Sequence, residues 1–148
     1  MSEKSEIELS ATYYWEHFSY ILRYIDRHYL PLLQEKEIVF LKDFSELTFA
    51  AQCLYLRLAS RRSAYFRIEK LHYPEIGDLA NPMRILQSSG FLLEVREGVE
   101  SIFTKQECVI LAKKQGIKVP SSASKEDAAA LVSSPDLIAA FSAGVVAP

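Results

Sequence analysis

Cysteine and glycine are scarce in this chain of 148 residues. The 2 cysteines, Cys53 and Cys108, stand far apart in apolar helical patterns, so we expect buried, reduced thiols. A disulfide framework or a zinc site would need more ligands at closer spacing. The 5 glycines are isolated from one another, which excludes a glycine-rich loop that binds phosphate.

Long apolar runs and recognisable catalytic sets are also lacking. No run approaches the roughly 18 apolar residues of a membrane span, and the polar, acidic N-terminus is unlike a secretory signal. We therefore expect an intracellular, cytoplasmic protein without a membrane partner. His17, His28 and His72 lack metal-ligand spacing, and the local sequence suggests no Ser-His-Asp or Cys-His set. The sequence predicts no catalytic residue and no metal site in this chain.

The chain does have enough apolar residues to form a core, and its charges are unevenly distributed. It is 49% hydrophobic and 24% charged, with 8 Tyr, 8 Phe and 1 Trp, so it can form one domain or two small ones. The net charge is −2, but residues 1–50 carry 5 Lys and Arg against 9 Asp and Glu, whereas residues 51–148 carry 12 against 10. A site for a polyanion should therefore be local and lie in the later part.

The spacing of apolar residues predicts a mainly α fold in three parts. Residues 1–46 form a helical segment, with helices over about 12–29 and 34–44. Residues 47–103 form a winged helix-turn-helix, in which a turn at 96–98 joins two strands into a small β-hairpin, the wing. Its helices are expected at 48–60, 68–71 and 78–90, and its strands at 65–67, 91–95 and 101–103.

Residues 104–148 are predicted to form a SAP-like helix pair and a tail. Thr104 and Glu107 form a capping box for a helix that runs to about Gln115, and Ser124 caps a second helix to about Leu131. The tail that follows is rich in Ala, Ser and Val and has no strong stop. We expect that the chain ends inside a longer parent protein.

A cluster of cations stands out between residues 57 and 70, where 5 cations accompany 1 anion. Such charge binds backbone phosphates without reading base sequence. The cluster consists of Arg57, Arg61, Arg62, Arg67 and Lys70, with Arg57 and Arg61 expected on one helical face. An alternative is that Arg67 or Lys70 forms an ion pair with Glu69, Glu75 or the acidic first helix.

Further candidates for DNA contact lie around this cluster. The helix expected at 81–89 offers only Asn81, Arg84 and Gln87 for base reading, so we predict recognition of DNA shape and phosphates, with Arg84 on a phosphate. Tyr65 is a candidate for stacking on unpaired bases, whereas Phe66 is expected in the core. A second set of cations either binds phosphate or forms a solvated helix face: Lys105, Lys113, Lys114, Lys118 and Lys125.

Three stretches together resemble the N-terminal region of a bacterial VRR-NUC nuclease of the Fanconi anaemia-associated family. They are Tyr13-Tyr14, the run 56–58, and the run 66–76 with its pattern Phe-Arg-x-x-Lys-Leu-x-Tyr-Pro-Glu-Ile. The similarity extends from about Tyr13 to Leu131. One departure is Ser63-Ala64, where the family pattern leads us to expect Gly-Pro after the basic pair.

The resemblance implies a DNA-binding front end for a metal-dependent, structure-specific 5′-flap nuclease that uses Mg²⁺ or Mn²⁺. Such nucleases hold metal with an acidic residue and a Glu-x-Lys triplet, and no Glu-x-Lys triplet occurs in these 148 residues. The resemblance therefore implies a nuclease parent whose C-terminal catalytic region packs nearby, with branched or flap DNA as the partner and DNA repair as the process. The alternative is a winged-helix module that binds proteins and not DNA.

Overall fold

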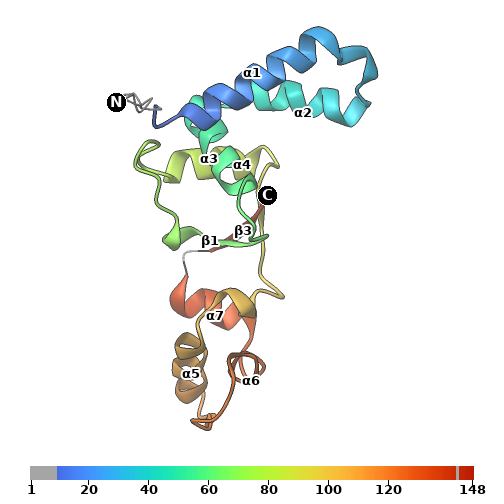
Figure 1. The fold of residues 1–148 in the computed structure, drawn as a ribbon. Helices are drawn as coiled ribbons and strands as arrows, with labels where there is room; N and C mark the ends of the chain where they lie inside the picture. Colours follow the sequence, from blue (N-terminus) through green and yellow to red (C-terminus); the bar gives the residue numbers. More distant parts are fainter. Residues whose placement is uncertain (1–9, 143) are drawn as a thin grey trace, which may run out of the picture. The chain divides into compact units, whose positions relative to one another are not determined.

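The computed structural model describes residues 10–142 and 144–148, and within them the chain forms seven α-helices and a three-stranded sheet (Figure 1). The described residues divide into two compact units. The first unit contains the residues up to Arg57 together with Tyr73–Ile85, and the second contains Leu58–His72 together with Leu86–Pro148. Each unit is described by itself below.

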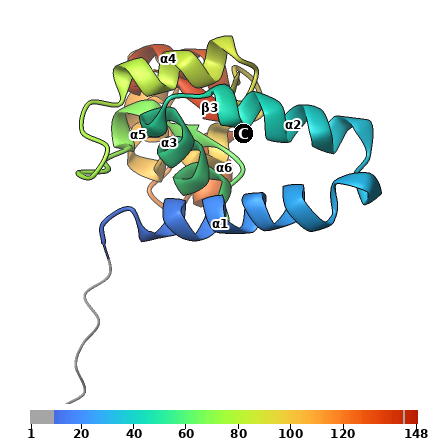
Figure 2. The ribbon, with the colours of Figure 1, turned by 90° about the horizontal axis from the view of Figure 1, so that it is seen from above.

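The first unit begins with two helices of opposite direction. Helix α1 spans Tyr13–His28, and a 3-10 turn at Leu30–Leu32, with Pro31 near its start, reverses the chain into α2 at Glu35–Glu46 (Figure 2). The Gln34–Glu37 capping box begins α2, which agrees with the extended backbone of Gln34. Both helices were expected from their apolar spacing, and their ends differ from the prediction by one or two residues.

Aromatic residues connect α1 to α2 and to α3, Phe49–Ala59. The ring of Phe18 on α1 meets the buried ring of Phe44 on α2 edge to face, with centroids 5.4 Å apart. On the same side of α1, the Trp15 indole N–H donates to the Gln52 side chain at 2.8 Å. The remaining part of this unit includes the beginning of α4, Ala80–Ser88.

The second unit is built around a small antiparallel sheet in the order β1-β3-β2. Strand β1 is Phe66–Arg67, β2 is Leu93–Glu94, and the central strand β3 is Val145–Ala147. Phe66 pairs with Val146, and Leu93 pairs with Ala147. Val145 and Val146 are fully buried, which suits two β-branched residues in a central strand.

This sheet corrects the predicted partner of the strand at 91–95. Residues 101–103 were expected to return as its neighbour, but Glu100–Ile102 forms a 3-10 turn and Phe103 is fully buried in the core. The partner is β3, from the tail for which no strand was predicted. The physical reason is that β3 takes the central position, where the fully buried Val145 and Val146 lie on a strand whose backbone pairs on both sides.

Three helices complete the second unit: α5 at Lys105–Lys114, α6 at Lys125–Ala129 and α7 at Ser134–Phe141. Their core contains Phe103, Cys108, Leu111, Ala128 and Leu137. The predicted caps of α5 and α6 are both present, since Thr104 accepts from the Glu107 amide and Ser124 accepts from the Asp127 amide. The mainly α fold and the predicted helix pair are therefore confirmed.

Two details complete the comparison with the predicted elements. Helix α7 was not predicted, although Ser133 caps it and Pro135 lies in its first turn, which is a helix-start signal. The short helix expected at 68–71 is a 3-10 turn, Ile68–Lys70. The boundaries at residues 46 and 103 stay a prediction.

Of the helices that the structure describes, none is both long and apolar enough to cross a membrane.

Candidate nucleic-acid interface

The candidate interface is a hollow of about 500 Å³ on the second unit, which we call the basic hollow. Three exposed cations, Arg61, Arg62 and Lys70, line it together with Tyr65, whose side chain is 37% exposed. No Asp or Glu is among the described residues that line it. The remaining lining residues are Ser63, Phe66, Arg67, Leu71 and Ile102.

Local structure explains why these cations gather. Helix α3 ends at Ala59, so Arg61 lies in the loop that follows, and the predicted shared helical face with Arg57 is wrong. In this loop the Ser63 hydroxyl donates to the Tyr65 carbonyl at 2.8 Å. The chain then enters β1, where Phe66 is buried as predicted and its ring lies 5.9 Å from the Arg61 guanidinium.

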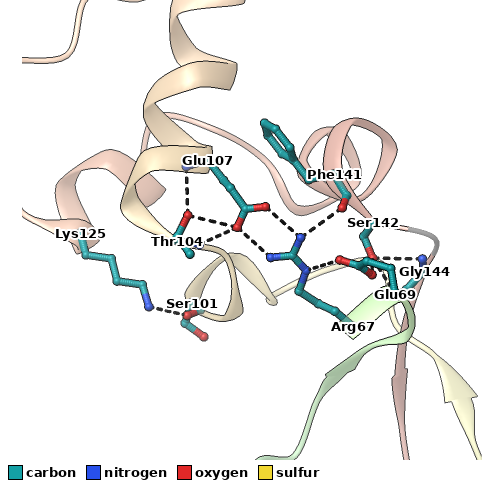
Figure 3. A network of polar contacts seen from close by, with 9 residues as sticks. All are labelled: Arg67, Glu69, Ser101, Thr104, Glu107, Lys125, Phe141, Ser142 and Gly144. Carbon is teal, nitrogen blue, oxygen red and sulfur yellow. Dashed lines mark hydrogen bonds and ion pairs between the residues drawn. The ribbon is translucent and has the colours of Figure 1, made fainter. Parts of the chain in front are cut away.

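Arg67 is corrected from a candidate phosphate contact to an internal ion-pair residue. It is only 7% exposed, and its guanidinium forms two parallel hydrogen bonds to Glu107, at 2.7 and 2.8 Å (Figure 3). Its Nε donates to Glu69 at 2.6 Å, and the group lies 4.3 Å from the Phe103 ring centroid. Because these donors are already bonded inside the protein, Arg67 is not available to DNA.

An ion pair of Arg67 with Glu69 was one alternative predicted from the sequence, but its pair with Glu107 was not predicted. Glu107 lies 40 residues away from Arg67. Its place in the capping box of α5 already explained a glutamate at this position, so no distant partner was expected. It has both roles, because Oε1 also accepts from the Thr104 amide at 3.0 Å. The hydrogen bonds from Arg67 first, and from Thr104 next, lower the pKa of Glu107 to about 2.

A further hydrogen bond extends this network to the end of α7. The Ser142 hydroxyl donates to Glu69 at 2.8 Å and accepts from the Gly144 amide at 3.0 Å. Although burial alone would raise the pKa of Glu69, the hydrogen bonds from Ser142 and Arg67 lower it below its usual value. The network therefore joins β1, α5 and the segment before β3 with charged hydrogen bonds (Figure 3).

Arg57 belongs to the first unit, where it is held by its own partners. Its guanidinium pairs with Glu75 at 2.6 Å and lies 4.2 Å above the Tyr14 ring centroid. The Tyr14 hydroxyl donates to the same carboxylate at 3.2 Å. Burial alone would raise the pKa of Glu75, but hydrogen bonds, including that from Arg57, lower it. This arrangement gives Arg57 a structural role that the sequence analysis did not predict.

The remaining predicted cations lie outside the basic hollow. Arg84 on α4 is exposed and donates to Asn81 at 2.6 Å, one turn earlier in the same helix. Lys113 and Lys114 occupy the last turn of α5, where positive charge is favoured by the helix dipole. Lys125 donates to the Ser101 carbonyl at 2.8 Å. Lys105 is half-buried and Lys118 is exposed.

A metal-dependent active site would need several oxygen, nitrogen or sulfur ligands in one place. Among residues 10–142 and 144–148, no group of three or more His, Cys, Asp or Glu side chains is placed to hold a metal ion. Cys53 and Cys108 are both free and buried, as expected.

Comparison with protein families and curated proteins adds an independent finding. The family described as FAN1, HTH domain, matches residues 12–93. A Fanconi-associated nuclease 1 homolog from Pseudomonas aeruginosa is 36% identical over 80 residues, which is 54% of this chain and 14% of that protein. The Fanconi-associated nuclease 1 of Mus musculus is 33% identical over 94 residues, covering 62% of this chain and 9% of that protein.

Solved structures agree with this match. The structure described as paFAN1 bound to 2nt 5′ flap DNA with gap superposes with a TM-score of 0.76 at 26% identity. A second, with 1nt 5′ flap DNA, gives the same score and identity. In each case the match covers 93% of this chain and 27% of the solved chain, so the chain spans about a quarter of that structure.

Proposed function

The chain belongs to the family of the FAN1 HTH domain, and we propose that it is the DNA-binding region of a structure-specific 5′-flap nuclease. In this role it grips duplex DNA near a branch, through phosphates. The catalytic step is carried out by a nuclease region outside these residues. The observation that carries the proposal is the basic hollow, which the exposed side chains of Arg61, Arg62 and Lys70 line together with Tyr65.

The chemistry of the hollow supports a grip on phosphates. Arginine forks match phosphate oxygens in geometry, and a lysine adds a mobile positive charge. Tyr65, at the same hollow, offers a half-exposed ring on which an unpaired base at a flap can stack. Contacts to phosphates and stacking on a ring do not select one base over another, so the proposed recognition is of DNA shape.

The other parts of the proposal concern the parent protein. We propose that its nuclease region uses Mg²⁺ or Mn²⁺, held by carboxylates that these described residues do not provide. We also propose that this region lies near the present chain and that the protein acts on cytoplasmic, nucleoid DNA during repair. Exposed apolar side chains of the first unit, such as Leu32 and Phe49, support a neighbouring protein surface.

The test measures binding of a fluorescent 5′-flap DNA by anisotropy at low salt. The variant Arg62→Glu with Lys70→Glu reverses two charges in the basic hollow, and both side chains are exposed, so the fold should survive. We expect affinity to fall at least tenfold. The slope of log affinity against log salt should decrease by about 2, because each lost phosphate contact contributes roughly 0.9 for duplex DNA.

The control variant changes the net charge of the chain by the same amount, at positions outside the basic hollow. Lys36→Glu with Arg96→Glu removes two exposed cations that do not line the hollow, and it should weaken binding far less. Equal losses in the two double variants would show a nonspecific charge effect and would overturn the assignment. No DNA binding by the unmodified chain at any salt between about 50 and 200 mM would favour the protein-interaction alternative instead.

A further inference from the structure

A second surface combines rings and cations, on helix α1 in the first unit. Its residues follow helical spacing, at i, i+3, i+4, i+7 and i+8, so they share one face. They line a hollow of about 400 Å³, and no acidic residue is among the described residues that line it. This surface, called here the α1 outer face, consists of Tyr20, Arg23, Tyr24, Arg27 and His28.

The rings of the α1 outer face are exposed to an extent that packing does not explain. Tyr20 is 63% exposed and Tyr24 is 47% exposed. The contacts of α1 with α2 and α3 include those of Trp15 with Gln52 and of Phe18 with Phe44, whereas Tyr20 and Tyr24 remain exposed. The α1 outer face is therefore not needed for the core of its own unit.

One of these rings, that of Tyr24, also contacts its aromatic neighbours. The Tyr24 and His28 rings lie 4.5 Å apart at 45°, and the Tyr24 and Tyr29 rings lie 5.9 Å apart. Arg23 is steadied by a hydrogen bond from its Nε to the Ser19 carbonyl at 3.4 Å. Planar rings alternating with guanidinium groups along one helix make a repeating surface, in which each ring has a cation within one turn.

We propose that the α1 outer face binds unpaired, single-stranded DNA, with bases stacked on Tyr20 and Tyr24 and phosphates held by Arg23 and Arg27. Stacking platforms beside positive charge are the usual means of holding single strands without sequence preference. The proposal rests on the proposed function in that DNA is the partner. It adds a separate surface for the single strand to the basic hollow, where duplex phosphates are held and Tyr65 stacks on one unpaired base.

An acidic peptide is another ligand that the cations of this face would attract. The charges and rings of α1 favour DNA over such a peptide. Asp26 and Glu16 lie on the same helix outside this face, so the net charge of α1 is balanced and offers little to a ligand that binds by charge alone. The distinguishing feature of the face is its pair of exposed rings. An acidic side chain has no flat ring that could stack on them. A nucleobase fits them, because every base has a flat face.

The experiment uses the full chain and a fluorescein-labelled oligothymidylate of about 12 nucleotides, read by anisotropy. Tyr20→Ala with Tyr24→Ala should weaken binding about tenfold or more, because two stacking positions are lost. Tyr20→Phe with Tyr24→Phe keeps both rings and should bind like the unmodified chain. Circular dichroism verifies that each variant remains helical.

A charge-matched pair tests the phosphate contacts. Arg23→Gln with Arg27→Gln should weaken oligothymidylate binding and reduce its salt dependence, whereas Lys36→Gln with Lys42→Gln on α2 should change both less. Unflapped duplex DNA should bind the tyrosine variants as it binds the unmodified chain. The proposed function is tested separately by the Arg62 and Lys70 variant, so either conclusion can fail alone.

Two results would overturn the inference. One is oligothymidylate affinity that is the same for the alanine, phenylalanine and unmodified chains. The other is displacement of oligothymidylate from the α1 outer face by polyglutamate at an equal concentration of charge, which would identify a site for acidic peptides.

Discussion

Arg67 and Glu107 are joined by two parallel hydrogen bonds, 2.7 and 2.8 Å long, although 40 positions separate them in the sequence. The pair joins strand β1 to the first turn of α5, and Phe103 covers the guanidinium at 4.3 Å. Both side chains are largely buried. The stability of each charge in this buried place depends strongly on its partner, because neither ion can regain full hydration in the folded state.

Replacing Arg67 alone should therefore be strongly destabilising. We expect Arg67→Ala to lower the free energy of unfolding by about 3 to 5 kcal/mol, because Glu107 and Glu69 lose their common cation. Urea unfolding followed by circular dichroism measures the change. Arg67→Met with Glu107→Gln should recover part of the loss, since it removes both charges together.

The control for Arg67 is the exposed ion pair between Arg96 and Glu94, for which Arg96→Ala should leave the unfolding midpoint nearly unchanged. An Arg67→Ala chain as stable as the Arg96→Ala chain would contradict the role given to the buried pair. A second readout separates structure from binding. If Arg67→Met remains folded, its affinity for flap DNA should equal that of the unmodified chain.

Stability should fall in acid because of Glu107. Its pKa is about 2 in the folded protein, below the usual value of an unfolded glutamate, so the folded state binds this proton less readily. The contribution is complete above about pH 5 and is lost as the pH falls from there toward 2. Glu69 and Glu75, whose pKa values are also lowered, act in the same direction.

Urea midpoints measured at several pH values between about 7 and 2 check this expectation. With allowance for solvent screening, the part due to Glu107 should amount to about 1 to 2 kcal/mol. The Glu107→Gln chain starts less stable, but its stability should decrease less over the same pH range. Parallel pH profiles for the two chains would show that Glu107 is not the source.

Gly144 should tolerate no side chain. Its φ is +144°, a conformation that L side chains rarely adopt, and an added Cβ would lie 3.2 Å from Ile68 Cδ1. Gly144→Ala should cost more than Gly98→Ala, where φ is +70° and nothing lies within 4 Å. Thermal unfolding compares them. Ile68→Val should recover part of the Gly144→Ala loss, because valine lacks the δ carbon.

A chain ending at Ser142 should lose the structure of the second unit. Without β3, the backbones of β1 and β2 lose their common pairing partner, and Val145 and Val146 leave the core. Hydrogen exchange should show fast-exchanging amides throughout 86–142, whereas α1 and α2 in the first unit should remain protected. Unchanged protection in 86–142 would show that the helices alone maintain this unit.

The helices could be predicted because their signals are local. Apolar spacing located α1 and α2, and the capping residues Thr104 and Ser124 located the starts of α5 and α6. Phe66 was assigned to the core from its place in a short strand, and it is 4% exposed. In each case the cause lies within one or two helical turns of the residue concerned.

The partners of β1 and Arg67 could not be predicted because they are distant in sequence. Strand β1 pairs with β3, and no local pattern distinguishes Val145–Ala147 from an unstructured tail. In the same way, a basic run does not reveal which of its members turns inward. Arg67 alternates toward the core only once the strand and its Glu107 partner are in place, whereas Arg61, Arg62 and Lys70 remain at the surface.

The central position of β3 has a consequence for synthesis on the ribosome. Phe66 pairs with Val146, roughly 80 residues later in the chain. At about 5 to 20 residues per second, β1 emerges roughly 4 to 16 seconds before the strand that covers it. During that interval the side chain of Phe66, which is buried in the folded protein, and the unpaired edge of β1 can contact other nascent chains.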